Sequence, residues 1–167
     1  MTVTIRYFYK SNNRDELKKV NELFDSLGDY SEVQDDNVFV EKSIFKPAGE
    51  SFGVIFKTVL DDCKLVCDLL KKDIDFPGSL EESVAGEGMD FLLLYRDGQI
   101  SAKTSDWYIE EWMGGYDDFE SFQEIYPNCT EKEFNKWKEY EHIYYWYEEN
   151  GKPVFSADVP LHDATLI

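Results

Sequence analysis

A tight β-hairpin signal in the middle of the chain constrains the fold more than any other feature. The apolar run from Phe91 to Arg96 is followed by Asp97-Gly98, a dipeptide that suits the positive-φ positions of a two-residue turn. Residues 100–104 then return with strand-forming character. Because such a turn joins neighbouring antiparallel strands, the chain is expected to contain an antiparallel sheet rather than only the parallel strands of a doubly wound fold.

Strand and helix patterns alternate in the first third of the chain. Residues 3–9 and 38–45 are rich in β-branched and aromatic residues, which predicts two strands. Between them, apolar residues recur at helical spacing after Asn12 or Asn13, either of which suits a helix N-cap. Gly28 is a typical helix stop, so this stretch predicts one amphipathic helix.

A second helix is predicted from about Ser51 or Val54 to Lys71. Residues 52–59 also have strand propensity, but Ile55, Val59, Cys63, Val66 and Leu70 fit one helical face, which favours the helix. Further along, Pro77-Gly78 and the glycine-containing segment 86–88 are typical chain breakers. We therefore expect them to bound a loop region.

The last third of the chain combines loops with short elements. Residues 106–126 predict a loop with short helices, and Thr130 with Glu133 forms a capping box that opens a further helix. Residues 143–149 fit either the end of that helix or a strand of a second hairpin, and residues 158–167 resemble an irregular tail. We expect one α+β domain over residues 1–167, with antiparallel hairpins packed against several helices.

The net charge of −18 restricts the partners of the chain. A field of this sign repels nucleic-acid phosphates and anionic lipids, and it attracts basic proteins. The chain also has 4 Trp, 11 Tyr and 12 Phe, whereas disordered acidic chains are poor in aromatic residues. We therefore predict a folded protein whose partner is a basic protein, with no direct binding to nucleic acid or membrane.

The acidity is concentrated in one aromatic-rich window. Between Lys103 and Lys132 there are eight carboxylates and no Lys or Arg, and Trp and Tyr, which often anchor protein interfaces, lie among them. The alternative is a solvated loop whose aromatic side chains face the core. If the window is a docking surface, its partner-binding residues are Asp106, Trp107, Glu110, Glu111, Trp112, Tyr116, Asp117, Asp118 and Glu120.

The residues that usually hold metals or cofactors do not form a recognisable set. Cys63 and Cys67 lie four residues apart, but their apolar neighbours favour buried, inert thiols over metal ligands. The chain has two histidines, and no phosphate-binding loop or nucleophile motif is present. We expect no metal, no cofactor and no catalytic residue.

The whole-chain profile resembles that of bacterial toxin-immunity proteins, the acidic inhibitors of contact-delivered nuclease toxins. Residues 106–124 carry this resemblance locally, and because no family motif is matched it assigns no individual residue. It implies a small mixed α and β inhibitor that binds a basic nuclease-type toxin. Two alternatives are a phage-type nucleic-acid mimic that blocks DNA-binding or defence proteins, and an enzyme with an unrecognised carboxylate site.

The expected location is the cytoplasm. The first residues show no basic region followed by an apolar run, and no apolar stretch approaches the roughly 18 residues that span a membrane. Three cysteines, an odd number, do not suggest a disulfide framework.

Overall fold

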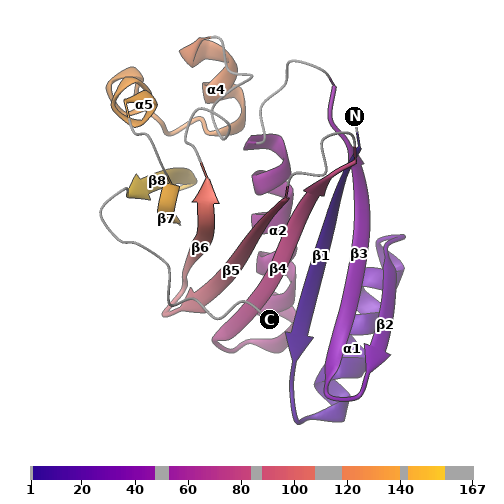
Figure 1. The fold of residues 1–167 in the computed structure, drawn as a ribbon. Helices are drawn as coiled ribbons and strands as arrows, with labels where there is room; N and C mark the ends of the chain where they lie inside the picture. Colours follow the sequence, from indigo (N-terminus) through magenta and orange to yellow (C-terminus); the bar gives the residue numbers. More distant parts are fainter. Residues whose placement is uncertain (1, 48–52, 84–87, 108–117, 140–142, 157–167) are drawn as a thin grey trace.

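The computed structural model describes residues 2–47, 53–83, 88–107, 118–139 and 143–156, and these form an α+β fold, as predicted (Figure 1). Eight antiparallel strands form one sheet in the order β2-β3-β1-β4-β5-β6-β7-β8. The strands are β1 (Thr2–Lys10), β2 (Tyr30–Gln34), β3 (Asn37–Phe45), β4 (Ile74–Glu82), β5 (Gly88–Arg96), β6 (Gln99–Trp107), β7 (Ile143–Glu149) and β8 (Lys152–Ser156). The described helices are α1 (Arg14–Ser26), α2 (Gly53–Leu70), α4 (Phe119–Ile125) and α5 (Glu131–Lys138).

The first four strands and the first two helices follow the split β-α-β connectivity. Each helix links two strands that lie on either side of a third, so β3 separates β1 from β2, and β1 separates β3 from β4. Both helices lie on the same side of the sheet (Figure 1). The opposite side of these strands carries no described helix, and we call it the open face.

Helix α1 begins and ends as the sequence predicts. The Asn13 side chain accepts the backbone N–H of Asp15 at 2.9 Å, which satisfies one free donor of the first turn. Gly28 follows the helix with a φ of +83°, in the left-handed region where a glycine carries no steric penalty. Leu17, Val20 and Phe24 form the buried stripe against the sheet.

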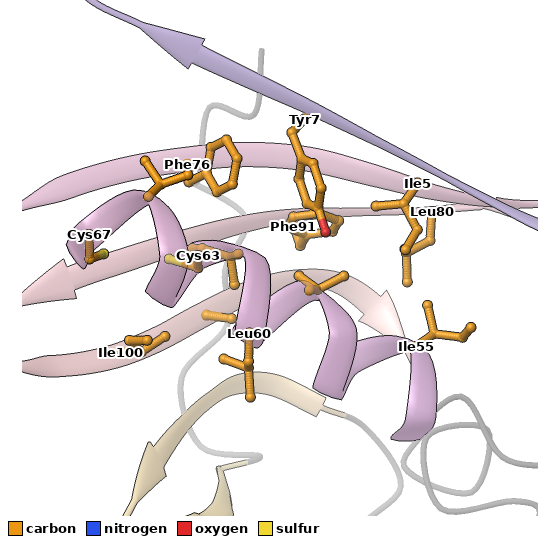
Figure 2. Packing of buried hydrophobic residues seen from close by; sticks show 14 of the residues in the cluster. Ile5, Tyr7, Ile55, Leu60, Cys63, Cys67, Phe76, Leu80, Phe91 and Ile100 are labelled. Atoms are coloured by element: carbon orange, nitrogen blue, oxygen red, sulfur yellow. The ribbon is translucent and has the colours of Figure 1, made fainter. Parts of the chain in front are cut away.

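The core lies between these two helices and the sheet. Strand β1 alternates strictly, with Val3, Ile5, Tyr7 and Tyr9 buried on the helix side. Helix α2 supplies its predicted apolar face to the same layer, and Figure 2 shows it packed on side chains of β1, β4 and β5. Tyr7 and Phe76 stack there with ring centroids 4.7 Å apart.

The expectation that Pro77-Gly78 bounds a loop is wrong, because both residues lie inside β4. Gly78 faces the core, where a Cβ atom would collide with the ring of Phe91 and with the carbonyl oxygen of Arg6. The glycine is therefore required by close packing rather than by a turn. Pro77 lies where the β1–β4 ladder stops, since the last paired residues are Tyr7 and Gly78 and proline has no N–H to donate.

The predicted hairpin turn at Asp97-Gly98 is present, and the structure decides between the two alternatives for residues 143–149. Asp97 and Gly98 have φ values of 53° and 80° and join β5 to β6, as predicted. Asn150 and Gly151 have φ values of 53° and 73° and join β7 to β8, so residues 143–149 form a strand. The predicted tail, residues 158–167, lies outside the described residues.

Helices α4 and α5 pack together through a second set of aromatic side chains. The Phe122 ring centroid lies 5.2 Å from that of Phe134 and 6.1 Å from that of Trp137. Trp137 in turn contacts Phe155 of β8 at 5.1 Å, which connects the pair of helices to the sheet. The predicted capping box is confirmed: the N–H of Glu133 donates to Thr130, and the Glu133 carboxylate accepts the N–H of Thr130.

Candidate functional site

The predicted partner-binding residues are only partly covered by the described structure. Asp106 and Trp107 lie at the end of β6, where its pairing with β7 is irregular between Lys103 and Trp107. Asp118 and Glu120 lie at the start of α4. The remaining predicted residues, Glu110, Glu111, Trp112, Tyr116 and Asp117, lie outside the described residues. The structure therefore does not test whether residues 106–124 form a docking surface, and that assignment stays a prediction.

Asp118 has a structural role as well as an exposed charge. Its side chain accepts the backbone N–H of Ser121 at 2.9 Å and caps α4. This hydrogen bond favours the charged form and holds the pKa of Asp118 below its usual value. Reversing its charge would therefore weaken the start of α4 in addition to changing the surface.

The α4–α5 region presents further carboxylates to solvent. Glu120, Glu124 and Glu131 are exposed, and none of them forms an ion pair with another residue in the described part of the chain. Glu133 is different, because it pairs with Lys152 of β8 and that contact lowers the pKa of Glu133. This region is acidic, but its aromatic side chains are directed into its own core.

The open face of the sheet also carries aromatic and acidic side chains close together. Phe8 of β1 lies directly opposite Phe39 of β3, with ring centroids 5.4 Å apart. The Tyr30 ring of edge strand β2 lies 6.3 Å from Phe39 and is 58% exposed. We call these three side chains the aromatic strip.

Charged side chains flank the aromatic strip. Arg6 lies between two carboxylates, with Nε 2.9 Å from Glu41 and Nη1 2.7 Å from Glu81. The hydrogen bond that Arg6 donates to Glu81 is the main reason that the pKa of Arg6 is raised. Glu32 of β2 accepts the Tyr30 hydroxyl at 2.7 Å, so the outer end of the strip also carries a carboxylate.

Apolar residues continue from the strip onto β4 and β5. Pro77 and Leu92 are paired across these two strands, and continuing the β1–β4 register by one step would place Phe8 beside Pro77. The ladder has ended there, and a cleft of about 630 Å³ opens between the last residues of β1 and the first residues of β4. We call it the β1–β4 cleft; it is lined by Tyr9, Lys10, Lys72, Asp73, Ile74, Asp75, Pro77, Leu92 and Arg96.

The cations of the β1–β4 cleft already have anionic partners. Lys72 lies 2.6 Å from Glu16, and this contact raises the pKa of Lys72 and lowers that of Glu16. Arg96 donates to the Ile74 carbonyl at 2.9 Å and pairs with Asp75. The cleft is therefore poorly suited to an anion, and Ile74, Pro77 and Leu92 offer apolar surface beside the charged side chains.

A buried ionic group lies on the helix side of the sheet. The Lys42 ammonium lies 2.7 Å from Asp62 and 3.1 Å from Asp29, and the Tyr7 hydroxyl donates to Asp62 at 2.8 Å. Burial is the main cause of a raised pKa at Asp62, and it outweighs the opposing effects of Lys42 and Tyr7. This carboxyl lies in the core rather than in the β1–β4 cleft, so it does not supply the cleft with an acid-base group.

The three cysteines are buried and form no disulfide. The hydrogen bond that Cys63 donates to Cys67, together with burial, raises the pKa of the Cys63 thiol, and the same bond lowers the pKa of Cys67. Burial raises the pKa of Cys129 to about 12. The raised pKa makes Cys63 and Cys129 poor nucleophiles, and Cys67 is buried. Among the described residues, no three His, Cys, Asp or Glu side chains are grouped so that they could hold a metal ion.

The described helices are all too short or too polar to cross a membrane. Comparison of the chain with protein-family models, with curated proteins and with solved structures found no match.

Proposed function

We propose that the protein is a non-catalytic inhibitor that binds a basic protein and neutralises it in a stoichiometric complex. The leading instance is a bacterial immunity protein whose partner is a nuclease-type toxin. One observation carries the proposal: in a chain of net charge −18, aromatic side chains and carboxylates lie together on a sheet face that no described helix covers. Tyr30 is exposed and Phe8 and Phe39 are half-buried, and aromatic residues bordered by charges are typical of protein interfaces.

The chemistry of the charges supports a basic partner. A field of this sign concentrates cationic proteins near the surface and speeds their association. Nuclease clefts bind phosphates and are accordingly basic, so a carboxylate-rich protein can occupy them in place of nucleic acid. The β1–β4 cleft combines paired cations with the apolar residues Ile74, Pro77 and Leu92, which supports a binding role rather than a catalytic one.

The proposal includes a reducing location, the cytoplasm. Three buried thiols without a disulfide are ordinary for a protein of that compartment. An immunity protein in the cytoplasm would meet the toxin where its nucleic-acid substrate lies.

The test is capture followed by reconstitution. The tagged chain is expressed in its source cell, and proteins that co-purify at low salt and elute at high salt are identified and purified. Adding the chain to a captured basic enzyme should abolish its activity, with an equivalence point at one chain per partner. Partners that are not basic, or a basic partner whose activity persists when saturated, would contradict the proposal. Inhibition of several unrelated DNA-binding proteins would instead indicate nucleic-acid mimicry.

A further inference from the structure

The open face offers an anchor site and a matching charge pattern on one surface. Phe39 and Phe8 of the aromatic strip, with Pro77 and Leu92, follow one row across β3, β1, β4 and β5. In this row Pro77 is buried and the other three side chains are half-buried. With strands about 4.8 Å apart, this row is about 15 Å long. The β1–β4 cleft interrupts it between Phe8 and Pro77, where the ladder ends.

We propose that the basic partner docks on the open face, with one aromatic or aliphatic side chain in the β1–β4 cleft and with Lys or Arg side chains against Glu32, Glu41 and Glu81. This inference rests on the proposed function and assigns its binding surface. It moves the interface away from the window at residues 106–124, which the sequence favours. The occupant is thus a cationic protein surface with a protruding apolar residue.

The cleft is a stable feature of the fold rather than a consequence of loose packing. Pro77 cannot donate to β1, and Gly78 holds β4 close to β1 one residue further on, beneath the Phe91 ring. Arg96 holds the first residue of β4 through the Ile74 carbonyl. The two strands therefore separate at a defined point, and a partner side chain would meet a preformed cleft.

The charges on the open face favour a partner with positive charge. Glu32, Glu41 and Glu81 outnumber Arg6, the cation that lies among them. Two carboxylates share that one guanidinium, so cations from a partner would find acceptor oxygens beside the aromatic rings. A second copy of the chain is a poor occupant, because two chains of net charge −18 repel each other.

The size of the surface is adequate for a specific complex. Four of the strands that form it have 9 residues each, which corresponds to a length of about 30 Å. Five strands of this spacing span about 700 Å² of sheet face, which is close to the roughly 800 Å² that each partner buries in a standard interface.

Defined peptides can test the surface without knowledge of the natural partner. The probe is acetyl-Lys-Lys-Phe-Lys-Lys-amide, titrated into the isotope-labelled protein while backbone amide shifts are recorded by NMR. Its controls have the same length, one with glycine in place of phenylalanine and one with glutamates in place of lysines. We expect saturable shifts at the β1–β4 cleft and the aromatic strip with the first peptide only. Shifts confined to α4 and α5, equal shifts with the glycine peptide, or no saturable shifts would overturn the proposal.

Matched variants separate the open face from a general charge effect. Leu92→Arg places a cation at the β1–β4 cleft, whereas Leu69→Arg makes the same change on α2, where Leu69 is 38% exposed. Peptide affinity should fall about fivefold or more in the first variant and change little in the second. If Leu92→Arg fails to fold, Glu32→Lys on β2 and Glu22→Lys on α1 form a second pair of exposed substitutions. Equal losses of peptide affinity in the open-face variant and in its control would contradict the docking site.

The same variants distinguish this inference from the function on which it rests. Once a basic partner is purified, its inhibition can be titrated with the Leu92→Arg and Leu69→Arg chains. Inhibition by the unmodified chain with no difference between the variants would overturn the docking face and leave the proposed function standing. Peptide binding at the cleft, with no basic partner inhibited by any chain, would support the face as a cation-binding surface and contradict the inhibitor function.

Discussion

Replacing Lys42 with methionine would leave two buried carboxylates without the ammonium that now lies between them. The side chain of Lys42 is 11% exposed, that of Asp29 13% and that of Asp62 6%. Methionine keeps much of the apolar stem, so the change removes charge with little loss of volume. Removing one partner of a buried ion pair costs about 3–5 kcal/mol, because the remaining charge stays desolvated. In a chain of this size, that loss corresponds to a fall of about 6–20 °C in Tm.

Asp62→Asn should be much milder than Lys42→Met. The asparagine amide oxygen can still accept the Tyr7 hydroxyl, and Lys42 keeps its contact with Asp29 at 3.1 Å. The group also loses the carboxylate that burial penalises most, so the expected loss is no more than about 1 kcal/mol. The order of the two effects follows from the charges: removing a carboxylate balances the group, and removing the ammonium unbalances it.

The pH dependence gives this prediction a second readout. Because burial raises the pKa of Asp62 above its unfolded value, the folded protein binds that proton more tightly than the unfolded chain. The ionisation of Asp62 therefore reduces stability as the pH rises through the folded pKa, and acid relieves this effect. Without Lys42 the pKa should rise further, so the deficit of Lys42→Met should be smaller at about pH 5 than at about pH 7.

The assay is urea unfolding of the wild-type protein and both variants at the two pH values, with equal m-values required for the comparison. A Lys42→Met loss below about 1 kcal/mol would refute the reasoning, as would a larger loss for Asp62→Asn than for Lys42→Met. A deficit that grows on acidification would contradict the assigned direction of the Asp62 pKa shift.

Three further substitutions test the fold. Gly78→Ala should lower stability by about 1–3 kcal/mol, because its methyl group collides with Phe91 and the Arg6 carbonyl; denaturant unfolding measures this, and a neutral effect would contradict the packing. Thr130→Ala should cost about 1 kcal/mol by loss of the capping box, and Thr130→Ser should restore most of it in thermal melts. Phe122→Ala, at the centre of the aromatic cluster of α4 and α5, should cost about 3–5 kcal/mol by unfolding, and a loss under about 1 kcal/mol would place Phe122 outside the core.

Local signals explain which elements could be predicted. The cap at Asn13, the turn at Asp97-Gly98 and the capping box at Thr130 each depend on a few neighbouring residues, and all three are present in the structure. Strand β2 was not predicted, because it lies at the sheet edge with four of its five residues exposed and therefore has no burial period. The sequence does not reveal the role of Pro77-Gly78, because Gly78 packs against Phe91, which is adjacent only in the folded chain.

The candidate site likewise has one part that is visible in the sequence and another that exists only in the folded chain. The acidic window is visible in the sequence because its charges are contiguous, whereas the aromatic strip is assembled from three strands. One signal was available: Phe8 and Phe39 fall at outward positions of strands whose alternate residues are buried. Their juxtaposition depends on the register of β1 and β3, which the sequence pattern does not specify.

The salt dependence of association with a purified basic partner tests the central claim most directly. Rates of association and dissociation are measured by stopped-flow from about 0.02 M to about 0.5 M salt, over which the Debye length falls from about 20 Å to about 4 Å. The account predicts an association rate at least about tenfold slower at high salt, with a much smaller change in the dissociation rate. An association rate that does not depend on salt would contradict electrostatic recognition of a basic protein by this chain.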